Sequence, residues 1–289
     1  MFGKSIWLTV LVEQRSEIEL QMMKLLSGTD LAEFIKERHA GQVKSLLAAG
    51  TQPKLAIVQT QDDPVINTYV SLKQKYGADI GVQVEVHKIL QSEAQEVLKK
   101  LNNDKTVHGI IVQLPLENPE QTDEIVNLVN PAKDVDALGE RSRFEPATPM
   151  AILWLLSGYN IDLKNKRVLL VGKGKLVGAP LAKILNKSSI LRDVIDRETP
   201  DLKARTIKAD VIITATGSPA ILYPDMIKHG AVVVDAGTAS EDGKTVGDLA
   251  PEVYQRDDLT LTPEKGGVGP LTVCALFENV LRAAENAEN

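Results

Sequence analysis

Hydrophobic and polar positions alternate along the chain with two different periods, one typical of strands and one typical of helices. Short, strongly apolar runs predict strands at residues 54–60 (KLAIVQT), 82–89 (VQVEVHKI) and 109–115 (GIIVQLP). Apolar side chains at helical spacing predict helices at residues 29–50, 67–81 and 92–104. Ser92 and Gln95 predict a capping box at the start of the last of these helices. Strands that alternate with helices in this way indicate a parallel sheet with right-handed crossovers.

A second strand-and-helix series follows a polar connection. Residues 130–149 are rich in turn-forming and charged residues, as in a link between domains, and a helix is expected to start near Pro149. Beyond this link, a strand, a glycine-rich turn and a helix occupy residues 166–186. Further elements are predicted as short strands at residues 191–195, 209–217, 231–237 and 259–263 and a last helix at residues 270–289. The pattern therefore predicts an α/β protein of two domains.

Gln113 is a polar residue near the carboxyl end of an apolar strand. The neighbouring Ile110, Ile111, Val112 and Leu114 suit a strand that is covered on both faces. A buried amide without partners costs roughly 1–3 kcal/mol, so the side chain of Gln113 must find hydrogen bonds. This stretch alone leaves two arrangements open: the amide bonds local backbone, or it faces a site at the carboxyl edge of the sheet.

Three glycines follow the first strand of the second series and lead into a helix. Gly172, Gly174 and Gly178 stand where backbone can approach phosphate groups closely and where a helix N-terminus offers its amides. Their spacing, GxGxxxG, is one residue longer than the usual dinucleotide fingerprint. Because a further strand ends in ATG, nucleotide binding is favoured over glycines that serve packing alone. We therefore expect a Rossmann-type, parallel-sheet, dinucleotide-binding domain.

The residues after the next strand point to two different dinucleotides. Asp196 could accept a hydrogen bond from a ribose 2′-hydroxyl, which favours NAD. Arg197, helped by Lys173, could instead pair with a 2′-phosphate, which favours NADP. A third interpretation is that both side chains are simply solvated.

Composition narrows the possible function classes. The 289 residues are 43% hydrophobic and 25% charged, as in ordinary globular proteins, and a net charge of −6 argues against broad nucleic-acid affinity. Cys274 is the only cysteine, which excludes an internal disulfide and fits a reducing compartment. The four histidines are scattered without an HxxxH pair, so no metal site is expected. We expect a cytoplasmic protein that binds neither nucleic acid nor membranes.

An apolar run near the amino terminus lacks the pattern of a signal peptide. The run IWLTVLV at residues 6–12 is followed by an acidic stretch and has no small-residue cleavage site. It is also too short to span a bilayer. Because the adjacent Met22 and Met23 offer another start, we expect residues 1–22 to be an N-terminal extension ahead of the folded domains.

Several motifs, taken together and in this order, resemble one enzyme family. They are TYVSLKQK, GIIVQLPL, PAKDVDALG, ATPMAI, VGKGKLVGAP, ADVIITATG and EKGGVGPLT with the helix that follows. From Lys24 to Arg282 the chain resembles the bifunctional methylenetetrahydrofolate dehydrogenases/methenyltetrahydrofolate cyclohydrolases of the FolD type. The resemblance implies a homodimeric enzyme of one-carbon metabolism that oxidises 5,10-methylenetetrahydrofolate and hydrolyses the methenyl product to 10-formyltetrahydrofolate.

The resemblance also implies how the two domains divide these tasks. A catalytic, folate-binding domain is expected at residues 23–147, completed by the C-terminal helix at residues 271–289. An NAD(P)-binding domain is expected at residues 148–270. The C-terminal helix is expected to return across the interdomain region.

The resemblance further implies the roles of individual residues. Gln113 is expected to bond Lys73, Tyr69 to stack on the aminobenzoyl group of the folate, and Asp136 to hold the pterin ring. These four form the expected catalytic set, with Lys73 transferring a proton during hydrolysis. Further folate contacts are expected from Leu114, Pro115, Gly267, Val268, Gly269 and Pro270, the last four in a segment that closes the folate pocket near the nicotinamide. Cofactor contacts are expected from Gly172, Lys173, Gly174, Gly178, Asp196, Arg197, Thr216, Gly217, Gly237 and Thr238.

The chain departs from the family pattern at several positions. Ala137 and Leu138 follow the KDVD motif where the family reads Gly-Phe, and Lys265 replaces a common proline. Asp196 and Arg197 stand in place of a His-Ser pair at the 2′-phosphate position. Because an arginine occupies that position and a lysine in the glycine turn adds a second cation, NADP is the expected cofactor and NAD the alternative.

Two other functions compete with this interpretation. A shikimate-dehydrogenase-like oxidoreductase has the same two-domain plan, but it needs a lysine–aspartate pair with a hydroxyl clamp for carboxylate, which the sequence around Lys73 does not show. A non-catalytic folate-binding relative would fit a dinucleotide strand that no longer binds cofactor.

Overall fold

The chain folds into two compact units. The computed structural model describes residues 24–241 and 244–287, and the extension expected at residues 1–22 lies outside the described residues. One unit, the three-stranded unit, consists of Gly28–Trp154 and the chain from Gly269 onward; the other, the six-stranded unit, contains Leu155–Val268 and the described residues up to Ser27. The prediction of a two-domain α/β fold with parallel sheets is confirmed.

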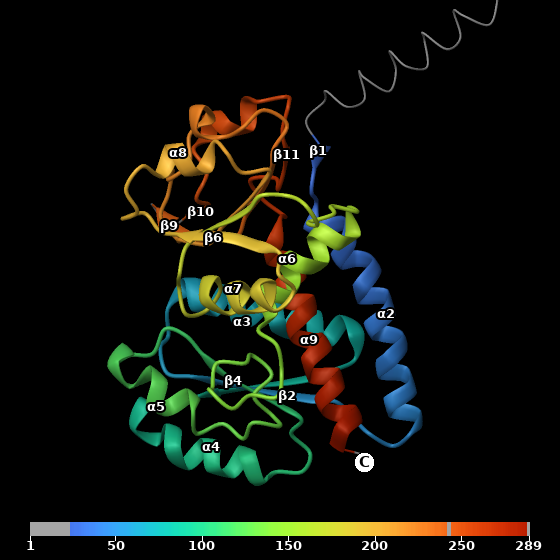
Figure 1. Cartoon of the computed structure of the whole chain (residues 1–289). Coiled ribbons are helices and arrows are strands. Elements are labelled where there is room, and N and C mark those ends of the chain that lie inside the picture. The colour runs from blue at the N-terminus through green and yellow to red at the C-terminus, as the bar shows by residue number, and fades with distance from the viewer. Residues whose placement is uncertain (1–23, 242–243, 288–289) are drawn as a thin grey trace, which may run out of the picture. The chain divides into compact units, whose positions relative to one another are not determined.

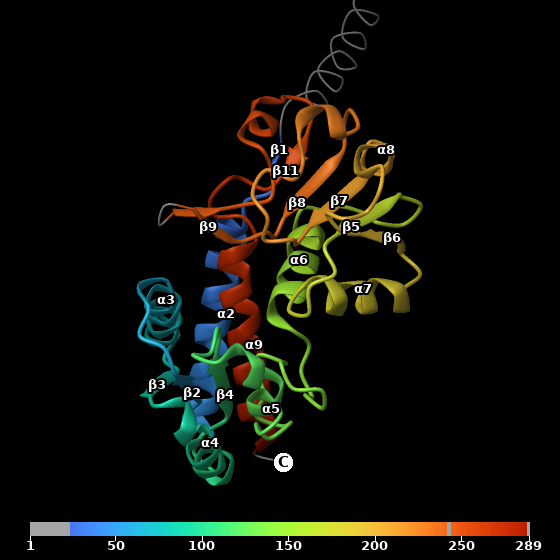
Figure 2. The same ribbon diagram turned by 90° about the vertical axis from the view of Figure 1, so that its left-hand side faces the viewer.

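The three-stranded unit is built on a parallel sheet in the order β3-β2-β4. Its strands are β2 (Lys54–Gln59), β3 (Gln83–Lys88) and β4 (Gly109–Gln113). Figures 1 and 2 show α2 (Gly28–Ala48), α3 (Pro64–Ile80) and α9 (Val268–Ala287) on one face of the sheet. The other face is covered by α4 (Ala94–Asn103) and α5 (Thr122–Val126), which follow the 3-10 turns η1 (Gln91–Glu93) and η2 (Pro119–Gln121).

Both faces of this sheet are buried, which explains the apolar strands. Leu55, Ile57 and Ile111 pack in the cluster that contains residues of α2, α3 and α9. Their neighbours along the same strands, such as Ala56 and Val58, pack against α4 and α5. Since successive strand residues point to opposite faces, a strand covered on both sides needs apolar residues at every position.

Helix α3 begins three residues earlier than its apolar spacing predicts. The carboxylate of Asp63 accepts hydrogen bonds from the amides of Val65 and Ile66 at 2.8 and 3.2 Å, and Pro64 occupies the first helical turn. Gly81 ends the helix with a φ of 87°. The helix that carries Tyr69 and Lys73 is therefore fixed at both ends.

The capping box predicted for Ser92 and Gln95 is wrong. Ser92 lies inside η1, and the amide of Leu90 donates to Glu93 Oε2 at 2.9 Å. A 3-10 turn precedes α4, so the stabilising carboxylate stands two residues earlier than the predicted glutamine.

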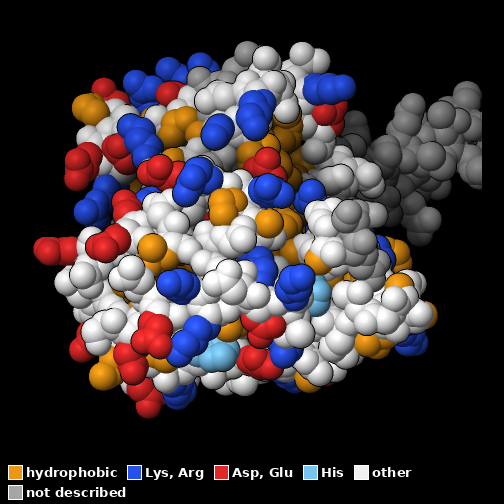
Figure 3. All heavy atoms as spheres, turned by 90° about the horizontal axis from the view of Figure 1, so that it is seen from below, with side chains coloured by type: hydrophobic (Ala, Val, Ile, Leu, Met, Phe, Trp, Pro, Cys, Tyr) orange, Lys and Arg blue, Asp and Glu red, His pale blue; other side chains and the backbone are white. Residues whose placement is uncertain are grey.

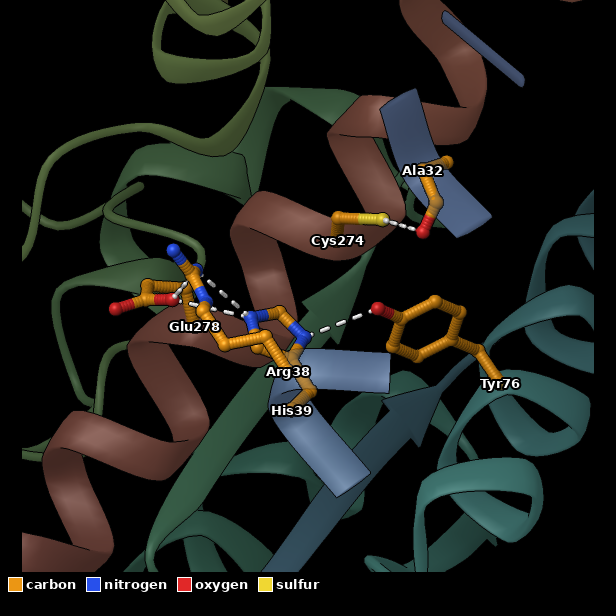
Figure 4. A network of polar contacts seen from close by, with 6 residues as sticks. All are labelled: Ala32, Arg38, His39, Tyr76, Cys274 and Glu278. Atoms are coloured by element: carbon orange, nitrogen blue, oxygen red, sulfur yellow. Dashed lines mark hydrogen bonds and ion pairs between the residues drawn. The ribbon is translucent and has the colours of Figure 1, made fainter. Parts of the chain in front are cut away.

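A polar network ties α3 to both of its helical neighbours (Figure 4). The ring of His39 on α2 is fully buried; Nδ1 lies 3.0 Å from the Tyr76 hydroxyl of α3 and Nε2 lies 3.0 Å from Glu278 Oε2 of α9. Arg38 pairs with the same Glu278 carboxylate at 2.5 Å. Tyr76 lies one turn beyond Lys73, so this network fixes the position of the helix that carries the site.

The six-stranded unit contains a parallel sheet in the order β1-β11-β8-β7-β5-β6. Its strands are β1 (Lys24–Leu25), β5 (Val168–Val171), β6 (Leu191–Ile195), β7 (Val211–Thr214), β8 (Val232–Asp235) and β11 (Thr260–Leu261). The views agree that α7 (Gly178–Lys187) and α8 (Leu202–Thr206) lie on opposite faces of this sheet. The unit also contains part of α6 (Ala147–Gly158) and the short turns η3 (Pro224–Met226) and η4 (Pro251–Gln255).

Two features of this unit were not predicted. The edge strand β1 pairs with β11 through Lys24 and Leu25, the first residues that the structure describes. An antiparallel hairpin joins β9 (Ala239–Glu241) to β10 (Lys244–Val246). Both are two or three residues long, which is too short for a periodic signal in the sequence.

The surface shows no separation of charges on the face drawn in Figure 3, where basic and acidic side chains lie among one another. Among the described residues, no helix is both long and apolar enough to cross a membrane.

Candidate functional site

A lysine and a glutamine meet at the carboxyl end of β4. Lys73 Nζ donates a 2.7 Å hydrogen bond to Gln113 Oε1. The amide nitrogen of Gln113 donates to the carbonyl of Leu114 at 2.9 Å, and only 9% of the residue is exposed. Both arrangements left open by the sequence are therefore present together: local backbone orients the amide, and its oxygen faces Lys73.

Lys73 and Asp136 each change the ionisation of the other. Burial lowers the pKa of Lys73 from its ordinary value, and the charge of Asp136 opposes that shift. Burial raises the pKa of Asp136, and the charge of Lys73 opposes it. The partner that is hydrogen-bonded to Lys73 is a neutral amide, so the lysine is oriented without a full charge that would fix it as ammonium. Because its pKa is lowered, such a lysine gives up its proton more readily than a lysine in water.

Tyr69 lies one turn before Lys73 on α3, and 38% of the residue is exposed. The ring of Tyr69 is thus partly accessible, and its stacking on the folate stays a prediction. A cis peptide bond joins Leu114 to Pro115 directly after Gln113, with Leu114 half-buried and Pro115 exposed. The expected folate contacts of this unit therefore lie at the carboxyl end of β4 and on the helix that covers it.

Asp134 shapes the loop that carries Asp136. Its buried carboxylate accepts from the amide of Gly139 at 2.9 Å and from that of Leu138 at 3.4 Å. Burial raises the pKa of Asp134 to about 6, although these amides favour its charged form. In the loop between Asp134 and Gly139, Ala137 has a φ of 56°. This is the left-handed region, which glycine adopts without strain, so the departure from Gly at this position has a conformational cost.

Gln59 is a site neighbour that the sequence interpretation missed. It is the register partner of Gln113 on the adjacent strand, so the two side chains point to the same face of the sheet. Gln59 is 2% exposed, and its amide nitrogen donates to Gln61 O at 2.6 Å and to Asn67 Oδ1 at 2.8 Å. The signal was available, because the apolar runs KLAIV and GIIV are each followed directly by a glutamine.

The GGVGP segment leads into α9. Gly266 has a φ of 81°, which favours glycine, and a Cβ on Gly267 would lie 3.0 Å from Thr262 Cβ, so a larger residue there would need Thr262 to shift. Val268 begins the helix, and Gly269 faces open space. That this segment closes a folate pocket stays a prediction.

The glycine turn of the six-stranded unit has the geometry of a phosphate cradle. Gly172 has a φ of 122°, and a Cβ there would lie 2.4 Å from Ala215 O. A Cβ on Gly178 would lie 2.2 Å from Gly172 O, whereas one on Gly174 would meet nothing within 4 Å. Two glycines are thus required for packing and the third leaves space beside the turn, so these residues fit a dinucleotide phosphate.

The charged residues beside this turn are already paired. Lys173 Nζ lies 2.9 Å from Asp196 Oδ2, and the Thr199 hydroxyl donates to Asp196 Oδ1 at 2.8 Å. These two bonds, first that of Lys173, lower the pKa of Asp196. Arg197 is exposed, and its Nη1 lies 3.5 Å from Ser218 Oγ. Asp196 therefore pairs with Lys173, and the exposed guanidinium of Arg197 lies beside Ser218.

Two aspartates that the sequence interpretation overlooked, the buried Asp248 and the partly buried Asp235, hold the other loops where cofactor contacts are expected. Asp248 accepts from the amides of Thr216 and Ser218 at 2.7 and 3.1 Å. Asp235 accepts from the amide of Gly237 at 2.9 Å, and burial raises its pKa. Of the residues in these loops that are expected to contact the cofactor, Gly217 has a φ of 62° and Thr238 is exposed.

Comparisons with known proteins agree with this geometry. Residues 26–136 match the model of the tetrahydrofolate dehydrogenase/cyclohydrolase catalytic domain. Residues 146–288 match the model of the NAD(P)-binding domain of the same enzymes.

Individual relatives cover nearly the whole chain. The bifunctional protein FolD of Nautilia profundicola is 35% identical over 91% of this chain and 98% of its own length. The crystal structure of the FolD enzyme from Campylobacter jejuni is 36% identical, with a TM-score of 0.85 over 91% of this chain and 99% of that one. The Trypanosoma brucei enzyme, solved with NADP and an inhibitor, is 27% identical, with a TM-score of 0.86 over 93% and 99%.

Shikimate dehydrogenases are more distant. The Thermus thermophilus enzyme covers 81% of the chain with a TM-score of 0.52 and 16% identity. That likeness concerns the fold alone.

Proposed function

Because the chain belongs to the tetrahydrofolate dehydrogenase/cyclohydrolase family, we propose a division of its residues between the two reactions of that family. The enzyme oxidises 5,10-methylenetetrahydrofolate to the methenyl form with NADP and hydrolyses the methenyl form to 10-formyltetrahydrofolate. The observation that carries the assignment is the bond between Lys73 and Gln113 beside Asp136.

The oxidation requires alignment more than proton transfer. The folate nitrogens stabilise the positive charge left on the methylene carbon, so no acid or base is needed at that step. Tyr69 stacks on the aminobenzoyl group and Asp136 hydrogen-bonds the pterin ring, which holds the carbon in one orientation. Leu114 and Pro115 supply the apolar wall next to Gln113.

The hydrolysis requires a group that exchanges protons. Water adds to the methenyl carbon, the bond from that carbon to one ring nitrogen breaks, and of the two water protons one reaches that nitrogen and one reaches solvent. Lys73 carries these transfers because burial lowers its pKa and Gln113 orients its nitrogen. The positive charge of the methenyl substrate lowers that pKa further.

The six-stranded unit holds the dinucleotide. The amides after Gly172 and the space beside Gly174 take its diphosphate, and Arg197 pairs with the 2′-phosphate. Lys173 adds positive charge nearby while it orients Asp196. NADP held by these residues would supply the acceptor for the hydride. The loops at Thr216–Gly217 and Gly237–Thr238 hold the nicotinamide half.

One assay tests this function against its competitors. We expect nicotinamide reduction with 5,10-methylenetetrahydrofolate and NADP, and none with shikimate or without substrate. Reduction with shikimate would support the dehydrogenase alternative, and reduction with neither substrate would support a non-catalytic folate-binding protein. Running NAD in parallel tests the role of Arg197.

We also propose that the enzyme is a cytoplasmic homodimer, on the basis of the sequence resemblance. Sedimentation equilibrium should give twice the 31.5 kDa chain mass. A concentration-independent monomer would contradict the proposal.

A further inference from the structure

The C-terminal helix contributes a buried amide to the loop that carries Asp136. Asn279 of α9 is fully buried. Its Nδ2 donates one hydrogen bond of 2.9 Å to the carbonyl of Val135 and another of 2.9 Å to the carbonyl of Glu145. Val135 directly precedes Asp136, so this amide binds the backbone next to a residue of the proposed folate site.

These bonds close the loop from both ends. Val135 begins the segment and Glu145 ends it, and one side chain holds the two carbonyls together. Asp134, directly before this segment, contacts two residues within it: its carbonyl accepts from the Ser142 hydroxyl at 2.8 Å and its carboxylate accepts from the amide of Gly139. Asp136 thus stands in a loop whose shape is set by polar contacts, and the outer contact comes from a helix more than a hundred residues away in the sequence.

The amide of Asn279 is not the side chain that would stabilise the fold most. Its Oδ1 is buried and accepts no hydrogen bond from any described residue, which is unfavourable. Replacing the whole amide by an apolar side chain of similar size removes this unpaired acceptor together with the two donors. The loss of folding stability is therefore partly offset, whereas the loss of loop geometry is not.

We propose that Asn279 is a positioning residue for folate binding, which acts by fixing the backbone on either side of Asp136. This inference rests on the proposed role of Asp136. Asn279 touches neither the carboxylate of Asp136 nor Lys73 in any contact of the described residues, so its effect must pass through the loop.

The test compares Asn279→Leu with a matched control, Asn102→Leu. Asn102 of α4 also donates through Nδ2 to a loop carbonyl, that of Leu128 at 2.8 Å, and it accepts from the amide of Asn130. We expect Asn279→Leu to raise the KM for methylenetetrahydrofolate roughly tenfold, as for one lost site contact, and to leave the KM for NADP unchanged. Asn102→Leu should lower the melting temperature at least as much without changing either KM.

A second variant covers the case in which Asn279→Leu does not fold. In Asn279→Asp the carboxyl is of the same size, and its protonated form keeps one of the two donors. The KM for folate of this variant should rise more steeply with pH than that of the parent, because ionisation places a negative charge against two carbonyls. A KM that follows the parent at every pH would count against the inference.

A double variant separates this inference from the proposed function. If Asn279 acts through Asp136, then Asn279→Leu adds nothing to the KM for folate in an Asp136→Ala background. If Asn279→Leu raised the KM for folate by the same factor in the parent and in Asp136→Ala, the inference would be overturned. An unchanged KM in Asp136→Ala alone would refute the role of Asp136, whereas a raised KM there with an unchanged KM in Asn279→Leu would refute only the role of Asn279.

Discussion

The two units each use a lysine beside a polar partner, but in opposite environments. In the three-stranded unit, Lys73 is half-buried and bonded to the neutral amide of Gln113, so burial lowers its pKa. In the six-stranded unit, Lys173 is 55% exposed and bonded to the carboxylate of Asp196, whose pKa it lowers. The first arrangement keeps a proton exchangeable, and the second keeps two charges paired in solvent.

This difference in exposure affects how strictly each site depends on its particular residues. The lowered pKa of the half-buried Lys73 depends on desolvation and on the geometry of its partners, which fits the resemblance of Tyr69, Lys73, Gln113 and Asp136 to the family motifs. Exposed ionic contacts contribute little to stability and are screened by solvent and salt. The neighbouring pair Asp196 and Arg197 could therefore replace the usual residues without loss of the fold.

The largest expected effect concerns the cyclohydrolase rate when Lys73 is replaced. Lys73→Met should lower the cyclohydrolase rate roughly 100-fold to 10,000-fold, the usual contribution of a proton-transfer group, while hydride transfer stays measurable. Both rates can be followed spectrophotometrically on one preparation. Lys75→Met, an exposed position on the same helix, should change neither rate. Equal cyclohydrolase rates in Lys73→Met and the parent would remove Lys73 from the mechanism.

The next effect concerns the buried carboxylate of Asp134. Its pKa is about 6 in the folded protein and 3.8 in an unfolded chain, so the folded state binds the proton more tightly. As the pH rises through this window, the free energy of unfolding therefore falls, by roughly 3 kcal/mol for this group. The difference in unfolding free energy between the parent and Asp134→Asn, measured with urea, should show that fall between pH 4 and pH 6.

A second carboxylate provides a control of opposite sign. The bonds from Arg256 are the main reason that the pKa of Asp258 is lowered to about 2. The stability that Asp258 contributes is present above pH 3.8 and is lost as the pH falls toward 2, so the difference for Asp258→Asn should increase with pH. The same slope in both variants would mean that burial of Asp134 does not have the effect described.

A smaller effect, on the KM for NADP, is expected for the exposed Arg197 of the six-stranded unit. Arg197→Ala should raise the KM for NADP about tenfold, the lower end for a charge-assisted bond to phosphate because this guanidinium is exposed, and it should leave the KM for NAD unchanged. Arg205→Ala is the matched control, since Arg205 is an exposed arginine of the same unit that pairs with Asp193. A parent enzyme that prefers NAD would instead support a ribose contact by Asp196.

The smallest effect concerns Ala137. Because its φ of 56° is strained for alanine, Ala137→Gly should raise the free energy of unfolding by up to about 1 kcal/mol. Ala204→Gly, in the exposed turn of α8, should lower it by a similar amount. Urea unfolding of both variants would show changes of opposite sign, and destabilisation by Ala137→Gly would contradict the strain.

The sequence predicted the elements with long apolar patterns and missed those fixed by contacts distant in the chain. Strands such as β4 and β5 are buried on both faces, so their composition alone identified them. The edge strand β1 could not be predicted, since two residues become a strand only by pairing with β11.

In the candidate site as well, some residues had a signal in the sequence and others are fixed only by contacts distant in the chain. Lys73 and Gln113 lie 40 residues apart, and the family resemblance brought them together before the structure showed the bond. Asn279 and the pairing of Lys173 with Asp196 had no such signal, because a buried asparagine in a helix or a charge beside a turn looks the same in sequence whatever it contacts. Such contacts depend on the packed geometry and not on local propensity.

Burial lowers the pKa of Lys73, and its hydrogen-bond partner Gln113 is neutral, so that partner adds no charge that would raise the pKa again. The most direct test is the pH dependence of the cyclohydrolase kcat in the parent and in Gln113→Glu. A carboxylate beside Lys73 stabilises the ammonium, so the inflection that reports this lysine should move up by roughly 1–3 pH units, while the dehydrogenase profile stays in place. An unmoved inflection, or equal movement of both profiles, would contradict the claim.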